Sequence, residues 1–339
     1  MDNSPLALVT GASGFVGGKI VERLLRDGRR VRAYSRRPLP ELGRLGVDVV
    51  LGDLADHEAL GRACLGVGTI FHVAARVGVW GPAEEFQKVN VEGTARLLDA
   101  AAASGVERFI YTSSPSVVYA GHDQRGIDES APLCTVAPCA YPTSKATAER
   151  LVRAANSAAL RTVALRPHLV WGPGDHHLVP RVVLAARAGK LRIVGRGKNR
   201  VDLTHIDNVV DAHLLAERAL ASPASPAAGR AYFITNDEPV DLWPWIDELL
   251  LGVGAMPIRR RIPLPAAYTI GAACEALWSL FPLSGEPPMT RFAAKELATD
   301  HWFSIEAARR DLGYVPRVSM AEGLKSYLAL LREFPIEVR

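Results

Sequence analysis

The sequence predicts an α/β protein built on a doubly wound parallel sheet, and three observations predict it. Apolar, partly β-branched runs of strand length alternate with helical patterns through the first half of the chain. A glycine-rich turn follows the first of these runs. The 339 residues, 48% hydrophobic and 22% charged, suffice for one large core and a smaller lobe.

The expected strands of the sheet are short apolar runs that lie between helical patterns. They span residues 6–10, 30–34, 47–51, 69–73, 108–112 and 162–166. After residue 166 the pattern loosens into Pro-rich and Gly-rich segments, with short strands near 191–194 and 231–235. We therefore expect residues 1–168 to form a dinucleotide-binding domain. Residues 169–339 mainly form a mixed α/β substrate lobe, from which some segments return to the sheet.

Gly11, Gly14 and Gly17 occupy the turn between the first strand and the helical pattern that starts near Phe15. A missing Cβ permits a tight turn and close backbone approach, and the free N–H groups of the helix end attract phosphate. The turn therefore predicts the pyrophosphate-binding site of a dinucleotide, with Ser13, Phe15 and Val16 among the binding residues.

A serine, a tyrosine and a lysine follow in the order that a carbonyl reductase requires. Ser114 lies just after the strand-like run 108–112, and Tyr141 and Lys145 lie at the start of a helical run. The oxygen that becomes negative as hydride arrives needs a proton donor, Tyr141, and a group that holds it, Ser114. We expect Lys145, four residues on, to favour the phenolate of Tyr141 by its charge, together with the helix dipole behind Pro142.

The end of the second strand carries Ser35, Arg36 and Arg37, where an NAD enzyme would place a carboxylate for the ribose hydroxyls. A guanidinium can pair there with a 2′-phosphate. NADP(H) is therefore the expected cofactor, with NAD(H) as the alternative.

These residues, together with four short motifs, resemble the extended short-chain dehydrogenase/reductase family over nearly the whole chain. The motifs are Gly-Asp-Leu at 52–54, His-Val-Ala-Ala at 72–75, Asn-Val-Glu-Gly-Thr at 90–94 and Leu-Arg-Pro-His at 165–168. The resemblance implies that further residues line the cofactor, namely Asp53, Leu54, Ala74, Ala75, Thr112, Pro167 and His168. It favours Ser114 as the catalytic serine, with Ser113 or Thr112 as alternatives.

The second lobe is most similar to the 3β-hydroxysteroid dehydrogenase branch. Val201 stands where epimerase-like members carry a diphosphate-binding arginine, although Arg200 is adjacent, and no acidic pair follows Ser114 as in the dehydratases. The segment 286–303 is closest to a bacterial group in that branch, which implies reduction of a 2-alkyl-3-oxoalkanoic acid; a 3β-hydroxysteroid is the alternative. A sugar-nucleotide epimerase and a non-catalytic dinucleotide-binding scaffold are weaker alternatives.

An apolar substrate with a carboxylate would need aromatic residues and a cation near the site. The candidate substrate residues are Arg76, Trp80, Ser116, Trp171 and Arg200, with His168 as a further cation. Trp278, Met289 and Phe292 are further apolar residues of the loops or lobe.

Composition limits the partners. The net charge of +4 is small and scattered, which gives nucleic-acid binding little support. Four cysteines without metal-ligand spacing fit a reducing cytoplasm and predict no metal site. The apolar stretch 265–281, preceded by arginines at 259–261, either packs in the lobe, which we favour, or rests on a membrane surface. The resemblance also implies a homodimer through helices near 91–103 and 146–155.

Overall fold

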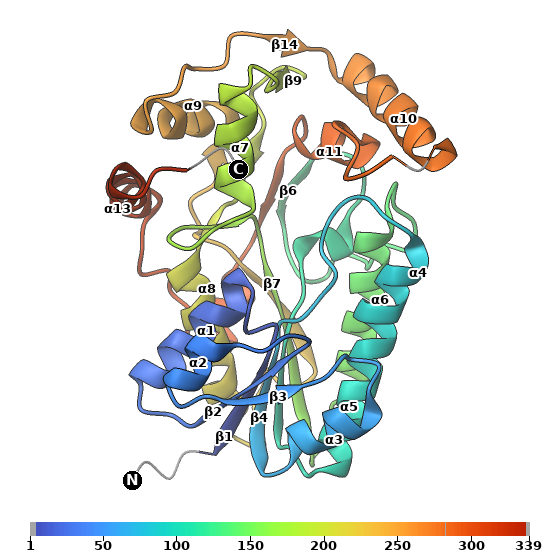
Figure 1. Cartoon of the computed structure of the whole chain (residues 1–339), viewed down its shortest axis with the longest axis vertical. Coiled ribbons are helices and arrows are strands. Elements are labelled where there is room, and N and C mark those ends of the chain that lie inside the picture. The colour runs from blue at the N-terminus through green and yellow to red at the C-terminus, as the bar shows by residue number, and fades with distance from the viewer. Residues whose placement is uncertain (1–4, 282, 337–339) are drawn as a thin grey trace.

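A seven-stranded parallel sheet forms the centre of the computed structural model, which describes residues 5–281 and 283–336 (Figure 1). Its strands, in chain order, are β1 (Leu6–Thr10), β2 (Val31–Ser35), β3 (Asp48–Leu51), β4 (Val67–His72), β5 (Arg108–Thr112), β7 (Arg161–Pro167) and β12 (Arg230–Ile234). They lie side by side in the order β12-β7-β5-β4-β1-β2-β3, and every pair is parallel. The doubly wound α/β fold predicted from the sequence is confirmed.

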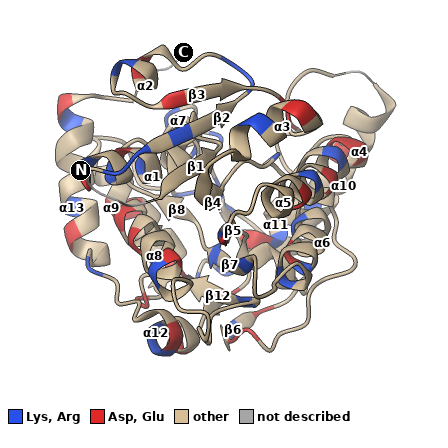
Figure 2. Ribbon diagram, turned by 90° about the horizontal axis from the view of Figure 1, so that it is seen from below, with Lys and Arg blue, Asp and Glu red and all other residues tan. Residues whose placement is uncertain are grey.

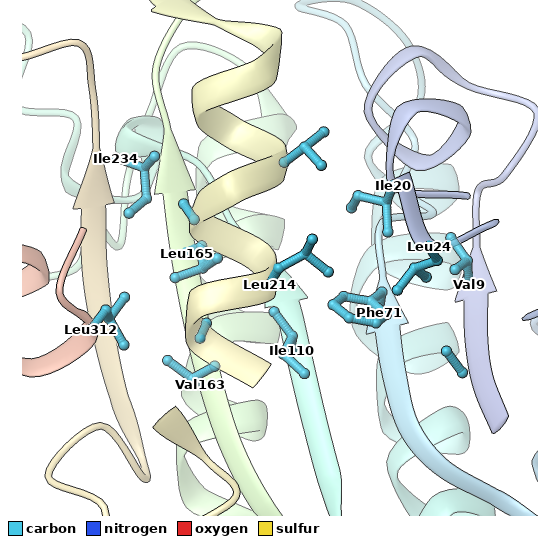
Figure 3. Packing of buried hydrophobic residues seen from close by; sticks show 14 of the residues in the cluster. Val9, Ile20, Leu24, Phe71, Ile110, Val163, Leu165, Leu214, Ile234 and Leu312 are labelled. Atoms are coloured by element: carbon cyan, nitrogen blue, oxygen red, sulfur yellow. The ribbon is translucent and has the colours of Figure 1, made fainter. Parts of the chain in front are cut away.

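Helices cover both faces of this sheet because successive side chains of each strand point to opposite faces. Val9 of β1 packs into one core with α1 and α8, and Leu8 packs into a second core with α3, α5 and α6. Figure 3 shows part of the first core. The helices that flank the sheet are α1 (Phe15–Arg26), α2 (Pro40–Arg44), α3 (His57–Cys64), α5 (Gly93–Ala103), α6 (Ala140–Ala154), α8 (Ile206–Ala219) and α12 (Glu306–Leu312).

The second lobe combines short strands with helices at one end of the sheet (Figure 1). Its small sheets are formed by β6 (Gln124–Ile127), β8 (Val170–Trp171), β9 (Ile193–Val194), β10 (Arg200–Val201), β11 (Thr204–His205), β13 (Val240–Asp241), β14 (Arg261–Ile262) and β15 (His301–Phe303). The remaining helical segments are α4 (Ala83–Phe86), the π-helical η1 (Gln87–Glu92), the 3-10 helix η2 (Pro115–Val118), α7 (Leu178–Arg187), α9 (Leu242–Gly252), α10 (Leu264–Leu280), α11 (Arg291–Glu296) and α13 (Met320–Glu333).

The two halves of the chain exchange one strand each. The segment near 231–235, expected as a short strand after the first domain, forms β12 and pairs with β7 at the edge of the large sheet. In the other direction, β6 lies before residue 168 but pairs with β15 in the four-stranded sheet. No local pattern in the sequence predicted the second exchange, because the pairing joins residues that lie far apart in the chain.

Lys and Arg (blue) and Asp and Glu (red) are interspersed along the helices of the ribbon in Figure 2, and neither sign dominates this view. Among residues 5–281 and 283–336, no helix is both long enough and apolar enough to cross a bilayer.

Candidate active site

The glycine turn after β1 fits a bound pyrophosphate because there is no room in it for side chains. Gly11 has φ +70°, and a Cβ built on it would lie 2.8 Å from the nitrogen of Ala74. A Cβ on Gly17 would lie 2.2 Å from the carbonyl oxygen of Gly11. Gly14 donates its N–H to Gly11 over 2.9 Å and offers no side-chain cap to α1. The first N–H groups of α1 are thus free to meet an anion.

The other expected cofactor residues surround this turn. Ser13 is exposed, and Val16 and Phe15 begin α1, where the Phe15 ring packs 6.1 Å from that of His176. Ala74 and Ala75 lie two and three residues beyond the end of β4. Pro167 ends β7, paired with Ile234 of β12.

The ends of β2 and β3 carry the residues expected near the adenosine. Arg36 and Arg37 are exposed just after β2, and neither forms an ion pair within the part of the chain that the structure describes. The hydroxyl of Ser35 accepts a hydrogen bond from the backbone of Arg37 over 3.2 Å. Asp53 accepts from the backbone of Ala55, and Leu54 packs against Gly93 of α5. Two unpaired guanidinium groups therefore lie where a 2′-phosphate is expected.

A buried chain of hydrogen bonds connects the glycine turn to the helix that follows β4. The hydroxyl of Thr10 accepts from the backbone of Val73 and of Ala74 and lies 2.8 Å from Nδ1 of His72. Nε2 of His72 lies 2.9 Å from Oγ1 of Thr94, whose hydroxyl donates to the carbonyl of Asn90. Because Thr94 already donates, His72 must donate from Nε2 and accept at Nδ1. Burial lowers the pKa of His72 to about 3, so this ring is neutral.

Asn90 links that chain to the residues around the tyrosine. Its Oδ1 accepts from the backbone N–H of Arg76 over 2.7 Å, and its Nδ2 donates to the Arg76 carbonyl and to Ser144 of α6. Asn90 lies in η1, where the backbone departs from α-helical geometry. The motif at 90–94 was noted in the sequence, but only the structure shows that the Asn90 side chain holds the Arg76 loop to α6.

The three candidate hydroxyls after β5 have different partners. Ser113 is buried and donates to Glu149 of α6 over 2.7 Å. The hydroxyl of Thr112 lies 2.8 Å from Nε2 of His213 on α8. Ser114 accepts from the backbone and hydroxyl of Ser116 and is hydrogen-bonded to Tyr141. Of the three, only Ser114 faces the tyrosine, in accord with the choice made from the sequence.

Tyr141 lies in the first turn of α6, one residue before Pro142, as the sequence predicts. Burial raises the pKa of Tyr141, and the hydrogen bond from Ser114 opposes that rise. Lys145 is not among the groups that shift the pKa of Tyr141 here, and its predicted influence on the phenolate stays a prediction. Nζ of Lys145 donates to the carbonyl of Thr112 over 2.6 Å and lies 4.2 Å from the centre of the Tyr111 ring.

Burial also lowers the pKa of Lys145, to about 7, so its ammonium is only partly charged near neutrality. The charge of Glu149 favours its cationic form, and Nζ contacts the Thr112 carbonyl and the face of the Tyr111 ring. The lysine is therefore positioned by the end of β5, one helical turn beyond Tyr141.

Arg76 and Trp80 lie in the loop that borders the tyrosine. The guanidinium of Arg76 forms an ion pair with Glu85 at 2.8 Å and lies over the ring of Phe86, which meets the ring of Tyr141 edge-on at 6.5 Å. Trp80 is half-buried. Ser116 lies beside Ser114, with its hydroxyl donating over 3.0 Å. Arg76, through Phe86, and Ser116, through Ser114, therefore lie close to the catalytic candidates.

The structure places three other expected residues elsewhere. His168 is buried, with Nε2 lying 2.7 Å from Nδ1 of His301, and burial holds its pKa well below the usual value, so it supplies no cation for a carboxylate. Trp171 is completely buried among His205, Trp245 and Tyr327, and is thus a core residue of the lobe.

Arg200, the third, is exposed on β10 and donates to the carbonyl of Pro239. Its backbone N–H donates to Oδ1 of Asp300 over 2.7 Å. Neither contact involves a residue next to Tyr141. The sequence pattern identified these residues by their chemistry, but could not show which side of a strand they occupy.

Two buried groups near the site were missed. Glu149 and Arg166, both completely buried, form an ion pair between α6 and β7, and Glu149 also receives the Ser113 hydroxyl. His213 fixes the Thr112 side chain from α8. A polar residue at an inward position of an otherwise apolar helix pattern is the one sequence signal that could have indicated them.

Comparisons with known proteins agree with this arrangement. The 3-beta hydroxysteroid dehydrogenase/isomerase family matches residues 8–265. A 2-alkyl-3-oxoalkanoate reductase of Stenotrophomonas maltophilia is 48% identical over 94% of this chain and 97% of its own length. One from Shewanella oneidensis is 43% identical over 96% of this chain and 86% of its own. The structure of MoeE5 in complex with UDP-glucose and NAD superposes with a TM-score of 0.72 at 28% identity, covering 96% of this chain and 98% of MoeE5.

Proposed function

Because the chain belongs to the 3-beta hydroxysteroid dehydrogenase/isomerase family, and is an NAD(P)-dependent oxidoreductase, we propose that it reduces a hydrophobic 2-alkyl-3-oxoalkanoic acid to the 3-hydroxy acid with NADPH. The similarity that carries this proposal is the 48% identity, over almost all of both chains, to a protein named for that reaction. The polar side chains around Tyr141 match the chemistry of such a carbonyl reduction.

In the proposed reaction, the bound nicotinamide supplies the hydride to C3 of the keto acid. Tyr141 gives its phenolic proton to the C3 oxygen, and Ser114 donates a hydrogen bond to the same oxygen as charge develops on it. Ser114 can do so because Ser116 supplies two donors to its oxygen, so the Ser114 proton is directed into the site, where it bonds to Tyr141 and would bond to the C3 oxygen of a bound substrate.

Lys145 would hold the ribose hydroxyls of the bound cofactor, and its positive charge would then lie near the phenol of Tyr141. Its present partners are the Thr112 carbonyl, at 2.6 Å, and the face of the Tyr111 ring, and an ammonium with three donors has others to offer to the ribose. Because the pKa of Lys145 is about 7, a carboxylate or hydroxyl that hydrogen-bonds to the ammonium would increase the fraction of Lys145 that is charged near neutrality.

The preference for NADPH rests on Arg36 and Arg37. Replacing both by alanine should raise the KM for NADPH roughly 10- to 100-fold, the effect of losing charge-assisted hydrogen bonds, and leave the KM for NADH unchanged. Arg44→Ala is the matched control, because Arg44 is an exposed arginine that already pairs with Glu41. Equal effects on both cofactors would contradict the NADPH preference.

The test of the reaction is oxidation of NADPH in the presence of a 2-alkyl-3-oxoalkanoic acid. Wild type should turn over, and Tyr141→Phe should lose about 10²- to 10⁴-fold in kcat while binding NADPH as before. Unchanged turnover in this variant would overturn the role of Tyr141. Binding of NADPH without turnover on any carbonyl compound would favour a scaffold function instead.

A 3β-hydroxysteroid dehydrogenase is the second candidate, and the description of the matched family favours it. The same protein assayed with a 3β-hydroxysterol and NAD(P) separates the two, since kcat/KM should be higher for the keto acid. A sugar-nucleotide reaction is opposed by Val201, which is completely buried where a diphosphate-binding arginine would stand.

We also propose a cytoplasmic homodimer in which α5 and α6, adjacent on one side of the sheet, pair with the same helices of a second copy. Their outward faces carry small residues such as Ala102 and Ala103 that would permit close approach. Light scattering during size-exclusion chromatography should report twice the chain mass, and a monomer at micromolar concentration would contradict this proposal.

A further inference from the structure

A completely buried ion pair lies beside the catalytic candidates. Nε of Arg166 on β7 donates to Oε2 of Glu149 on α6 over 3.0 Å, and the same oxygen accepts the hydroxyl of Ser113 over 2.7 Å. The half-exposed Arg153 lies 3.9 Å from Oε1 of Glu149. The face of the Phe233 ring covers the Arg166 guanidinium at 4.9 Å. The Glu149 carboxylate is therefore shut off from water and held by β7 and by the segment that follows β5.

Stability alone does not explain why two charges occupy this position. Removing a carboxylate and a guanidinium from water costs free energy that their attraction offsets only in part, and apolar residues of similar size often stabilise a core as well or better. Ala148, Val152 and Ala164 belong to just such an apolar core between α6 and the sheet. The presence of the pair is better explained by what its charge does for a neighbouring group.

Lys145 is that neighbouring group, because its side chain and that of Glu149 reach two consecutive residues of the chain. Both lie on the buried face of α6, one helical turn apart. Nζ of Lys145 donates to the carbonyl of Thr112 over 2.6 Å, and Glu149 accepts from Ser113, the next residue. The ammonium and the carboxylate therefore lie beside each other at the end of β5.

The other ionisable groups around Lys145 carry no charge near neutrality. His72 of β4 is neutral because burial lowers its pKa to about 3. Burial raises the pKa of Tyr111 and of Tyr141, so both phenols keep their protons. Of the groups that the structure describes around Lys145, Glu149 supplies the charge that favours the ammonium and opposes the effect of burial.

The helical segments that pack against the start of α6 contribute side chains that do not titrate. The amide of Asn90 in η1 donates to Ser144, and the ring of Phe86 in α4 meets the ring of Tyr141 edge-on. These contacts hold α6 in place but supply no charge. The protonation of the lysine therefore depends on the carboxylate one turn further along α6.

We propose that Glu149 is a positioning residue whose buried negative charge keeps Lys145 in its ammonium form beside Tyr141. Arg166 and Ser113 fix the carboxylate in the place where it can do so. The inference rests on the proposed role of Lys145 in the reaction, but the charge of the lysine can be measured without cofactor or substrate. In the absence of the carboxylate, burial would leave the amine largely neutral near neutrality.

The direct test is an NMR titration of Lys145 in the full-length protein labelled with carbon-13 lysine. The chain has seven lysines, and Lys145→Arg identifies the resonance by its loss. The wild-type midpoint should lie near 7, and that of Glu149→Gln should fall by about 1–2 pH units. Glu149→Asp keeps the charge and should titrate close to wild type. An unchanged midpoint in Glu149→Gln would overturn the proposal.

Glu217→Gln is the matched control, because Glu217 of α8 forms a largely buried pair with Arg29 on the other face of the sheet (Figure 1). It should leave the titration of Lys145 unchanged. If Glu149→Gln alone does not fold, Glu149→Gln with Arg166→Gln removes both charges and leaves two amides that can bond to each other. Its midpoint should also lie below that of wild type, because the charge that acts on the lysine is that of Glu149.

Kinetics should show the same dependence with the keto acid and NADPH, because kcat/KM reports the groups of the free enzyme. The value for Glu149→Gln should be about 10-fold below wild type at pH 8, and the difference should narrow toward pH 6 as acid restores the ammonium. A loss that is equal at every pH would make Glu149 a purely structural residue and would overturn the proposal. No turnover by the wild type would instead refute the proposed reaction, and the NMR titration would still decide the role of Glu149.

Discussion

The dinucleotide turn and the second lobe differ in how far apart in the sequence their contacting residues lie. The turn is complete within residues 10–17, and its closest outside contact, Ala74, lies two residues beyond the end of the neighbouring strand β4. The lobe is assembled from pairs such as β6 with β15, which bring Gln124 beside His301. A site formed by one short segment can be recognised from spacing alone. A pocket formed by many segments depends on long-range packing.

The largest effect on cofactor binding should come from adding a methyl group to a glycine of the turn. Gly17→Ala places a Cβ 2.2 Å from the carbonyl oxygen of Gly11, so the turn must open and the start of α1 must move. We expect loss of measurable NADPH binding by isothermal titration calorimetry. Gly61→Ala is the control: it lies in α3 with nothing within 4 Å of a built Cβ, and should bind normally and gain roughly 0.5–1 kcal/mol of stability. Normal NADPH binding by Gly17→Ala would contradict the inference that the short glycine turn forms the binding site by its own local geometry.

The next effect tests whether the lobe tryptophans serve packing or substrate binding. Trp171→Ala should cost about 3–5 kcal/mol in the free energy of unfolding, because the whole indole is buried. Trp80→Ala, at a half-buried loop position near Arg76, should instead raise the KM for the keto acid and leave the denaturant midpoint nearly unchanged. A stable Trp171→Ala variant with a raised KM would mean that Trp171 lines the pocket after all.

Alanine variants of two neighbouring serines should differ in effect, with Ser114→Ala lowering kcat and Ser113→Ala lowering stability. Ser114→Ala removes the donor that faces Tyr141 and should lower kcat about 10²- to 10³-fold with little change in melting temperature. Ser113→Ala removes a donor from buried Glu149 and should cost about 1–3 kcal/mol of stability with a smaller change in kcat. Thermal unfolding and steady-state kinetics on both variants decide the assignment, and the reverse pattern would make Ser113 the catalytic serine.

The smallest expected effect concerns acid pH. Burial lowers the pKa of His72 to about 3 and that of His213 to about 4, so between those values and 6.5 the unfolded chain binds more protons than the folded one. Stability therefore rises with pH through this window and is lost as pH falls below 6.5. His213→Gln, which keeps a polar group facing Thr112, should flatten the loss of melting temperature between pH 6.5 and 4. An unchanged pH profile would show that other groups carry the acid sensitivity.

The sequence predicted six strands of the large sheet and the glycine turn between β1 and α1, because each depends on residues near it in the chain, while the roles of Ser114, Tyr141 and Lys145 stay predictions. It could not predict the contact of Lys145 with Thr112, since that depends on how α6 packs beside the end of β5. The burial of His168 and Trp171 likewise depends on partners more than seventy residues away, His301 and Trp245. Residue chemistry was visible in these segments, but the direction of each side chain was not.

The exchange of β6 and β12 has a consequence for how the molecule could be divided. A fragment that ends at residue 168 would lose the edge partner of β7 and would leave β6 without β15, so it would expose two unsatisfied strand edges. The remainder would lack the four-stranded sheet's outer member. Neither piece is a self-sufficient folding unit, and we expect the chain to melt in one cooperative transition. A chimera of this chain with a relative would therefore have to take β6 from the same parent as β15, and β12 from the same parent as β7.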